Sequence, residues 1–331
     1  MDNQDYIIFE PKISITGLAK DMNTSRHTLL RYFNDNNIEY GRSKNNKISF
    51  LNHRMSKTVL ETNFKNKVIS FHNMKGGVGK TTTAINVACC ANALGAKVLY
   101  IDADPQGNSS IALTKNIKYK PKNPKILRDI FFDKKITDLS ECIIPISDGL
   151  DLIYSNLDNG RLDISAQIQM AHYNKIFKKK FKSIESNYDA IIIDLPPNLG
   201  FTVNASYAYS DLVVVPITTD TFSVSGLSVI KENIKTMFEE NDVSVNYKTL
   251  FNKYNGTHAV ANTIVNETIL DEHKKGCCIS MVIPNTQDIS NALSQGYSVF
   301  NDPRIKVNSK NEYSAITKEI FDFELRRRKI K

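Results

Sequence analysis

One short segment of the chain carries residue types that bind phosphate groups. It spans Lys75–Thr82, reads KGGVGKTT, and lies between an apolar run and a predicted helix. Glycines let the backbone curl so that successive N–H groups face one anion, and the start of a helix adds the positive end of its dipole. Lys80 supplies a charge for the β- and γ-phosphates, and the Thr81 hydroxyl can ligate Mg²⁺. The segment therefore predicts a site for a nucleoside triphosphate.

This segment departs from the usual phosphate-binding loop at its first position. The pattern G-x-x-x-x-G-K-[ST] requires glycine where the chain has Met74, and the residue after Met74 is an additional lysine, Lys75. A glycine-rich turn without a ligand has no need of two lysines and two threonines. We therefore interpret the segment as a deviant form of the loop.

Three aspartates follow apolar runs that have the pattern of buried strands. Asp102 and Asp104 come just after Val98–Ile101, and Asp194 ends the run Ala190–Ile193. A carboxylate at the end of a strand beside the phosphate loop is placed to hold Mg²⁺ through water. A single aspartate could simply cap a loop, but three in these positions predict a magnesium-dependent nucleotide enzyme.

From Lys67 onward, strand-like runs alternate with helical patterns. Runs that are apolar throughout are typical of a parallel sheet with helices on both faces, which binds ligands at the carboxyl ends of its strands. We therefore predict an α/β fold with a doubly wound, mainly parallel sheet, the P-loop NTPase fold, over residues 67–331. The expected helix after the loop is Thr81–Leu94, and the expected strands are Val68–Phe71, Val98–Ile101, Ala190–Ile193, Leu212–Ile217, Lys248–Phe251 and Ile279–Ile283.

Residues 1–60 have the pattern of a separate small domain, with residues 61–66 as a linker. Two short helical patterns, Ile15–Met22 and Arg26–Asn34, flank a polar turn with capping residues, as in a helix-turn-helix. Ile38–Phe50 follows as two extended pieces, which suggests a wing, and Asn52–Lys67 reads as a linker helix. The alternative is a helical hairpin used for dimerisation or packing. DNA binding is favoured by basic residues on the second helix and the wing: Arg26, His27, Arg31, Lys44 and Lys47.

Composition and charge restrict the class of protein further. The net charge is +8 over 331 residues, and basic residues gather at both ends of the chain, which favours a polyanionic partner. We see no signal-peptide pattern and no apolar run close to the roughly 20 residues that a membrane helix needs. The five cysteines lack the spacing of a zinc site and read as reduced thiols. A cytoplasmic location is therefore expected.

These motifs resemble those of the ParA family of partition ATPases, within the wider MinD/ParA class that shares the deviant loop. The resemblance covers about residues 67–303. It rests on Lys75–Thr82, on DPQ at 104–106 after Asp102, on GLDLI at 149–153 with Ser155, and on Asp194 with Pro196 and Pro197. A helix-turn-helix before the ATPase resembles the large, self-repressing plasmid members.

The resemblance implies roles for the matching residues. Lys75 would reach across an ATP-bound dimer to the phosphates of the partner chain, and Asp104 would position the attacking water. Thr81 would ligate Mg²⁺, with Asp102 and Asp194 supporting its shell. The remaining phosphate contacts would come from Gly76, Gly77, Val78, Gly79, Lys80 and Thr82, and the contacts with the base from Asn252 and Pro284.

The function implied is ATP-driven DNA partition on the nucleoid. The ATP-bound homodimer would coat nonspecific DNA, and a DNA-bound ParB-type partner would stimulate hydrolysis. Two alternatives stay open: a MinD-like ATPase that binds membrane through residues 312–330, and a nucleotide-switched repressor. Iron–sulfur chemistry is a weaker rival because the cysteines lack the placement it needs. Nonspecific DNA contacts are assigned to Arg304, Lys306, Arg326, Arg327 and Arg328.

Overall fold

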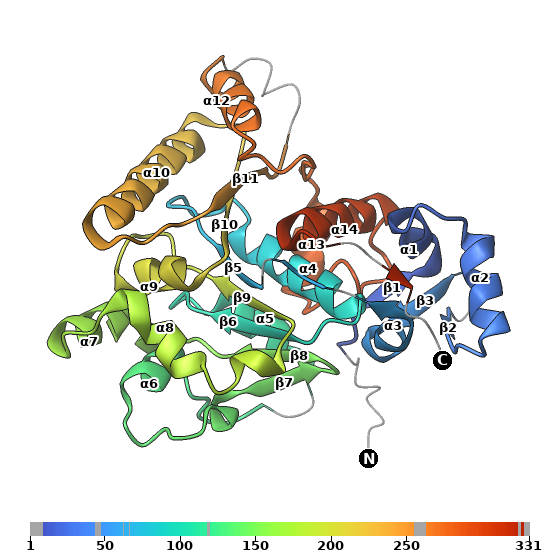
Figure 1. Ribbon diagram of the computed structural model, residues 1–331, viewed down its shortest axis with the longest axis horizontal. Helices are drawn as coiled ribbons and strands as arrows, with labels where there is room; N and C mark the ends of the chain where they lie inside the picture. Colours follow the sequence, from blue (N-terminus) through green and yellow to red (C-terminus); the bar gives the residue numbers. More distant parts are fainter. Residues whose placement is uncertain are drawn as a thin grey trace.

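A seven-stranded sheet forms the centre of the molecule (Figure 1). The computed structural model describes residues 9–43, 48–61, 63–65, 67–117, 120–254, 263–323 and 326–327. The strand order is β11-β10-β5-β9-β6-β8-β7, and every pairing is parallel except that of β7 with β8. The mainly parallel α/β sheet predicted from the sequence is therefore confirmed. Its strands are β5 Val68–Phe71, β6 Val98–Asp102, β7 Ile144–Ser147, β8 Leu150–Ile153, β9 Ala190–Asp194, β10 Leu212–Ile217 and β11 Tyr247–Phe251.

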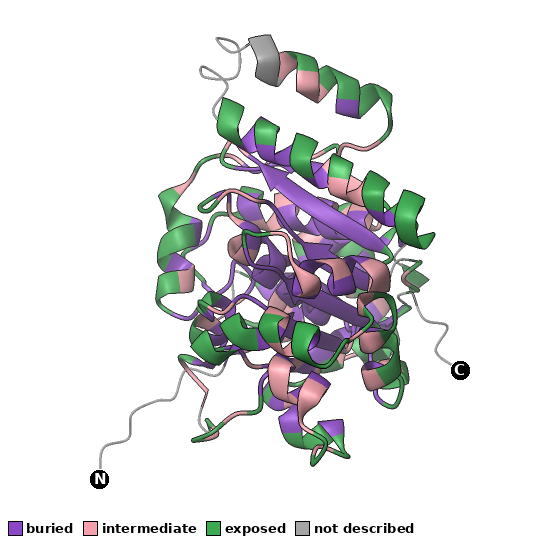
Figure 2. Cartoon of the chain, turned by 90° about the vertical axis from the view of Figure 1, so that its left-hand side faces the viewer, coloured by how far each residue is buried: buried purple, intermediate pink, exposed green. Residues whose placement is uncertain are grey.

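Helices cover both faces of this sheet because its strands are apolar on both sides. Ile191, Ile192 and Ile193 are all fully buried, and their side chains divide between two hydrophobic cores. Figure 2 shows the buried strands enclosed by helices whose outer faces are exposed. One core takes in α4 Lys80–Ala93, α13 Gln287–Ser294 and α14 Val307–Phe321. The other takes in α6 Leu127–Phe132, α7 Leu162–Ile168, α8 Tyr173–Phe181, α9 Phe201–Tyr209 and α10 Thr221–Asn241.

The described residues after position 67 also form shorter elements. Helix α5 follows β6 and has Gly107 as its N-cap, with a φ of +64° in the left-handed region. The others are α12 and three 3₁₀ turns. These elements are α5 Asn108–Thr114, α12 Thr263–Lys274, η1 Leu139–Cys142, η2 Leu157–Arg161 and η3 Glu185–Asn187.

One predicted strand does not form. Residues Ile279–Ile283 run beside the edge strand β11 and meet it through single bridges, with Ile279 N–H donating to Thr249 at 2.8 Å and Ile283 N–H donating to Phe251 at 2.9 Å. Between these bonds, the Ser280 N–H donates to the carboxylate of Glu319 on α14 at 2.9 Å. The segment is apolar enough for a strand, but its register with β11 is broken, because four positions along it, from Ile279 to Ile283, match only two along β11, from Thr249 to Phe251.

The N-terminal segment contains the two helices that the sequence predicted. Ser14 and Ser25 cap them by accepting backbone N–H groups at 3.0 Å. The extended pair that follows is also present, with a further strand before the first helix, and the three strands form the sheet β1-β3-β2. The elements are β1 Lys12–Ser14, α1 Ile15–Asp21, α2 Arg26–Asp35, β2 Gly41–Arg42 and β3 Ser49–Asn52. Lys44 and Lys47 lie outside the described residues.

The prediction of a linker helix over Asn52–Lys67 is wrong in the length of the helix. Helix α3 covers only His53–Val59, and the chain then extends as β4 Leu60–Glu61. Strand β4 pairs antiparallel with β12 Arg326–Arg327, so Leu60 leaves the helical conformation to form this pair.

Helix α3 packs against the end of α4, which ties the N-terminal segment to the sheet. The Ser56 hydroxyl donates to Ala93 O at 2.5 Å, and His53 Nδ1 lies 3.2 Å from Asn92 O. Gly95 has φ +96°, and a Cβ there would lie 2.8 Å from the backbone nitrogen of Lys57. Apolar residues of the N-terminal segment belong to the same hydrophobic core as α4 and α14. The division of the chain into domains at residue 60 stays a prediction.

Candidate nucleotide-binding site

The glycine-rich segment forms a loop between β5 and α4, at the carboxyl end of the sheet. Gly77 and Gly79 have φ values of +78° and +88°, which glycine adopts without a steric penalty. The loop opens onto a cavity of about 340 Å³. The structure thus brings the predicted phosphate-binding residues together with Asp104. The cavity is lined by Gly76, Gly77, Gly79, Lys80, Thr81, Thr82, Asp104, Gln106, Asn108, Pro197 and Lys253.

Lys80 is the buried cation of this cavity. Its side chain leaves the first turn of α4, and its Nζ donates to the carbonyl of Lys75 at 3.2 Å. Burial lowers the pKa of Lys80, and the nearby carboxylates of Asp194 and Asp104 act in the opposite direction. A cation held between carboxylates and a glycine-rich loop is suited to neutralising phosphate charge.

Two buried carboxylates lie side by side at the ends of adjacent strands. Asp102 on β6 is the register partner of Asp194 on β9. Burial raises the pKa of Asp194 to about 6, and the hydrogen bond from Ser109 (2.6 Å) lowers it. Burial also raises the pKa of Asp102, with the negative charge of Asp194 acting in the same direction. Two carboxylates this close in a buried site favour a cation between or beside them.

These carboxylates differ in what already binds their oxygens. Asp102 Oδ2 accepts from the backbone and the hydroxyl of Ser110 at 2.8 and 2.7 Å, and its Oδ1 accepts from Asp104 N–H at 3.2 Å. Asp194 Oδ1 is buried, and no donor among the described residues bonds to it. The metal role assigned to Asp102 stays a prediction, since its oxygens are engaged in shaping the Asp104 loop.

The free oxygen of Asp194 fits a magnesium ion. Mg²⁺ prefers oxygen ligands and commonly uses a carboxylate and a hydroxyl together with phosphate oxygens. The Thr81 hydroxyl is near enough to Asp194 to influence its pKa, and Thr81 also lines the cavity. Thr81 and Asp194 are therefore the residues suited to hold the metal, directly or through water.

Asp104 is presented to the cavity by a rigid turn. Its Oδ1 accepts the Gln106 N–H at 2.9 Å, and its backbone carbonyl accepts the Ser155 hydroxyl at 2.6 Å. Gly107 closes the turn so tightly that a Cβ there would lie 2.9 Å from Ser155 O. The Ser155 motif noted in the sequence thus supports the Asp104 loop.

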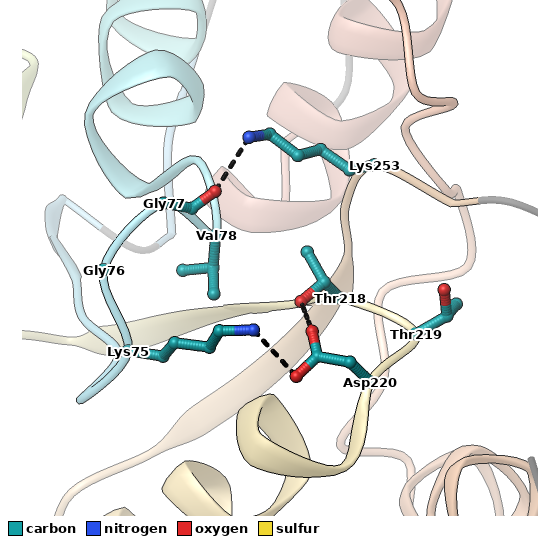
Figure 3. Close-up of a pocket in the computed structure, with 8 residues that line it drawn as sticks. All are labelled: Lys75, Gly76, Gly77, Val78, Thr218, Thr219, Asp220 and Lys253. Carbon is teal, nitrogen blue, oxygen red and sulfur yellow. Dashed lines mark hydrogen bonds and ion pairs between the residues drawn. The ribbon is translucent and has the colours of Figure 1, made fainter.

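Lys75 forms an ion pair within its own chain. Its Nζ lies 2.7 Å from Asp220 Oδ1, at the edge of a second cavity of about 320 Å³ (Figure 3). Asp220 also caps α10 by accepting the Ser223 N–H at 3.0 Å, and the Thr218 hydroxyl donates to its other oxygen. Burial alone would raise the pKa of Asp220, but these donors and Lys75 hold it below its ordinary value. The role of Lys75 towards a partner chain stays a prediction.

Asn252 and Pro284, predicted on the base side of the nucleotide, lie behind the loop. The Asn252 Nδ2 donates to Val78 O at 2.8 Å, and the side chain is buried. Pro284 lines a small cavity with Thr82, Ile289 and Tyr313. Their contacts with a base stay predictions, because the Asn252 amide is engaged with the loop itself.

The predicted DNA-binding residues lie away from this site. Arg26, His27 and Arg31 are exposed along α2. Lys306 is exposed before α14, whereas the guanidinium of Arg304 is bound by Asp302, with an N–O distance of 2.7 Å. Arg326 and Arg327 form β12, and Arg328 lies outside the described residues.

Three residues of this region were missed by the sequence analysis: Asp220, Lys253 and His72. An aspartate before a helical pattern signals a cap, which is a weak indication of Asp220, but nothing in the sequence indicates Lys253. His72 precedes the loop and is fully buried, with Nδ1 accepting the Tyr207 hydroxyl at 2.6 Å and Nε2 donating to Asn198 O at 3.0 Å. It therefore links the phosphate loop to the segment after Asp194.

His72 is expected to make the protein sensitive to acid. Burial, assisted by the charge of Lys80, lowers the pKa of His72 to about 3. The unfolded chain takes up this proton near pH 6.5 and the folded chain does not, so stability falls as the pH drops below 6.5. We expect this residue to account for a loss of about 2 kcal/mol between pH 7 and pH 5. Urea denaturation of wild type and His72→Gln at both pH values tests this, and an equal pH dependence of the two would contradict it.

The sheet order, the glycine loop and the strand-end carboxylates define a P-loop NTPase fold. The sequence profile of the AAA_31 family, described as an AAA domain, matches residues 66–247. The sporulation initiation inhibitor protein Soj of Bacillus subtilis is 30% identical over 259 residues, which covers 77% of this chain and 98% of Soj.

Two solved structures share the fold. A plasmid partition protein from Borrelia burgdorferi bound to AMPPNP superimposes with a TM-score of 0.63 at 23% identity, covering 78% of this chain and 98% of that one. Cobyrinic acid a,c-diamide synthase from Mycobacterium smegmatis, with a bound ATP analogue and magnesium, gives a TM-score of 0.58 at 21% identity, covering 77% and 92%. The profile match and the similarity to Soj show that the chain belongs to the ParA/Soj family of P-loop ATPases.

Proposed function

We propose that this protein is a DNA partition ATPase that binds ATP with Mg²⁺ and dimerises around it. The observation that carries the proposal is that Lys80 and Asp104 line the cavity of a lysine-bearing glycine loop, with the carboxylate of Asp194 near enough to Lys80 to offset part of the lowering of its pKa by burial. ATP and magnesium are supported by the related structures that hold an ATP analogue, one of them with magnesium.

In the proposed reaction, the loop N–H groups and Lys80 bind the phosphates, and Asp104 orients the attacking water. Bound Mg²⁺ at Thr81 and Asp194 would neutralise charge on the β- and γ-phosphates. On dimerisation, the Lys75 side chain leaves Asp220 and binds the phosphates of the nucleotide held by the partner chain. Its charge adds to that of Lys80 around the transferred phosphoryl group. A monomer therefore hydrolyses ATP slowly, and loss of the γ-phosphate loosens the dimer.

We further propose two modes of DNA binding. The α1–α2 pair with the β2–β3 wing reads an operator as a winged helix-turn-helix of a large plasmid-type protein, since α2 exposes Arg26, His27 and Arg31. Nonspecific DNA contacts come from Lys306 and the arginines of β12, with Arg304 available only if it leaves Asp302. The protein is then cytoplasmic and associated with the nucleoid, and a DNA-bound ParB-type protein stimulates its ATPase.

The MinD-like alternative is disfavoured by the packing of α14. The apolar residues that would enter a membrane include Tyr313, Ile316 and Ile320, and all three are fully buried against the core. Within the part of the chain that the structure describes, no helix combines the length and apolar character needed to span a bilayer. A repressor function can coexist with partition, because it would use the N-terminal segment.

ATPase measurements with and without DNA, and with and without the product of the neighbouring gene, test the proposal. We expect a low basal rate, little change with either addition alone, and a large increase with both. Strong ATP-dependent binding to vesicles with no response to DNA would favour the MinD-like alternative. Absence of ATP hydrolysis under every condition would refute the enzymatic proposal.

Nonspecific DNA binding in the presence of ATP is expected to depend steeply on salt. If four basic side chains contact phosphates, affinity falls about 100-fold between 50 and 200 mM monovalent salt, because condensed counterions are released on binding. Fluorescence anisotropy with a labelled random duplex measures this slope. A flat salt response, or an equal slope for a variant with Lys306, Arg326 and Arg327 replaced by alanine, would count against these contacts.

A further inference from the structure

Two consecutive residues at the end of β11 hold two consecutive carbonyl groups of the phosphate loop. Asn252 Nδ2 donates to Val78 O at 2.8 Å, and Lys253 Nζ donates to Gly77 O at 2.8 Å. Figure 3 shows the lysine reaching across to the loop from the chain that follows β11. We call Asn252 and Lys253 the carbonyl clamp.

The clamp determines where the loop directs its N–H groups. In a trans peptide the carbonyl and the following N–H point in opposite directions. With the carbonyls of Gly77 and Val78 directed to the clamp, the N–H groups of Val78 and Gly79 point away from it. Backbone N–H groups of this kind cradle the α- and β-phosphates in P-loop proteins.

Hydrogen bonds to the neighbouring strand β10 and within the clamp fix the position of Asn252 and Lys253. Asn252 is 3% exposed, its backbone N–H donates to Ile217 O at 2.8 Å, and its Oδ1 accepts the Lys253 N–H at 2.9 Å. Lys253 has φ +51°, an unusual conformation for a residue other than glycine, which is maintained here by that hydrogen bond. Asn252 also fills the space beside Gly79, where a Cβ would lie 2.1 Å from its Nδ2.

Lys253 has the position of a functional residue. It lines both the cavity that contains Lys80 and Asp104 and the cavity that contains Lys75 and Asp220. Its side chain is exposed, so loss of the hydrogen bond to Gly77 should change the free energy of unfolding only slightly.

We propose that Lys253 is a positioning residue that, with Asn252, sets the loop N–H groups in the direction required to bind the β-phosphate. This inference rests on the proposed function, because it requires the loop to bind a nucleotide. The clamp should therefore strengthen the binding of ADP and of ATP equally, since both carry the β-phosphate.

The test is the affinity of the full-length chain for mant-ADP and mant-AMPPNP with Mg²⁺. Lys253→Met keeps the aliphatic length and removes the donor, and loss of one charged hydrogen bond is expected to weaken both nucleotides equally, about 10-fold. Lys253→Arg keeps a donor and is expected to restore most of the affinity. The melting temperature without nucleotide should be the same for wild type and Lys253→Met, whereas the increase caused by ADP should be smaller in the variant.

Lys274→Met, on the exposed surface of α12, is the matched control and should bind as wild type does. Wild-type affinity in Lys253→Met would overturn the clamp. A loss confined to mant-AMPPNP would also overturn it, since that result indicates direct contact of Lys253 with the γ-phosphate. If wild type binds neither nucleotide, the proposed function fails, which is distinguishable from failure of the clamp alone.

Discussion

Lys80→Ala is expected to abolish both nucleotide binding and ATP-dependent dimerisation. Lys80 is 7% exposed and is the buried cation facing Asp194 and Asp104. Without it, the phosphates would enter a site whose remaining buried charges are negative. Removing one member of a buried charged set costs about 3 kcal/mol or more, which corresponds to a loss of over 100-fold in affinity. Fluorescent-nucleotide titration measures the affinity, and light scattering with ATP measures the mass.

The light-scattering experiment compares the mass of wild type with that of Lys80→Ala, each in the presence of ATP. We expect wild type to double its mass with ATP and Lys80→Ala to remain a monomer. Dimerisation of the variant at the wild-type ATP concentration would contradict the role of Lys80. A constant mass in both proteins would instead contradict the ATP-bound dimer.

Gly79→Ala is expected to remove the phosphate site and to destabilise the protein. Gly79 has φ +88°, and an added Cβ would lie 2.1 Å from Asn252 Nδ2. The left-handed conformation and the overpacking together cost about 2–4 kcal/mol, and relief of the clash displaces the loop. Urea denaturation gives the free energy of unfolding, and a mant-ADP titration gives the affinity.

Gly276→Ala provides the control for backbone conformation. Gly276 has φ +71° but nothing within 4 Å of a Cβ position, so this substitution carries the strain without the clash. It should cost about 1–2 kcal/mol and leave nucleotide binding unchanged. Equal effects of the two substitutions on mant-ADP affinity would show that the contact with Asn252 does not matter.

The centre of the site could be predicted because its signals are local. The loop, the helix it opens and the aspartates at strand ends are each defined by residues within about ten positions of one another. Parallel strands that end at one edge bring such segments together in any P-loop fold, so Lys80, Thr81, Asp104 and Asp194 converge as expected.

The partners of the loop could not be predicted because they are set by tertiary packing. Asp220 is 145 residues from Lys75, and Lys253 is 176 residues from Gly77. Asp220 follows β10, which is next to β5 in the sheet, and Lys253 follows β11, which is next to β10. No single segment of the sequence specifies this strand order. The assignment of Asn252 to the base had the same weakness, since it ignored the neighbouring loop carbonyl.

Errors in the elements also have identifiable causes. The strand expected at Ile279–Ile283 is apolar, but four positions along it match only two along β11, which interrupts the ladder. The helix expected to continue past Val59 ends because Leu60 pairs with Arg327, far along the chain. In contrast, α1 and α2 were predictable because serine caps and apolar spacing define them locally.

The continuity of the hydrophobic core between the N-terminal segment and α14 constrains how such a chain can evolve. Helix α1 lies against α14, with Lys318 Nζ donating to Asp21 O at 2.8 Å, and Phe64 stacks on Phe321. Removal of residues 9–60 would expose apolar side chains of α4 and α14 and favour aggregation. A relative that lacks this segment must therefore carry polar side chains at the positions of α4 and α14 that the segment covers here.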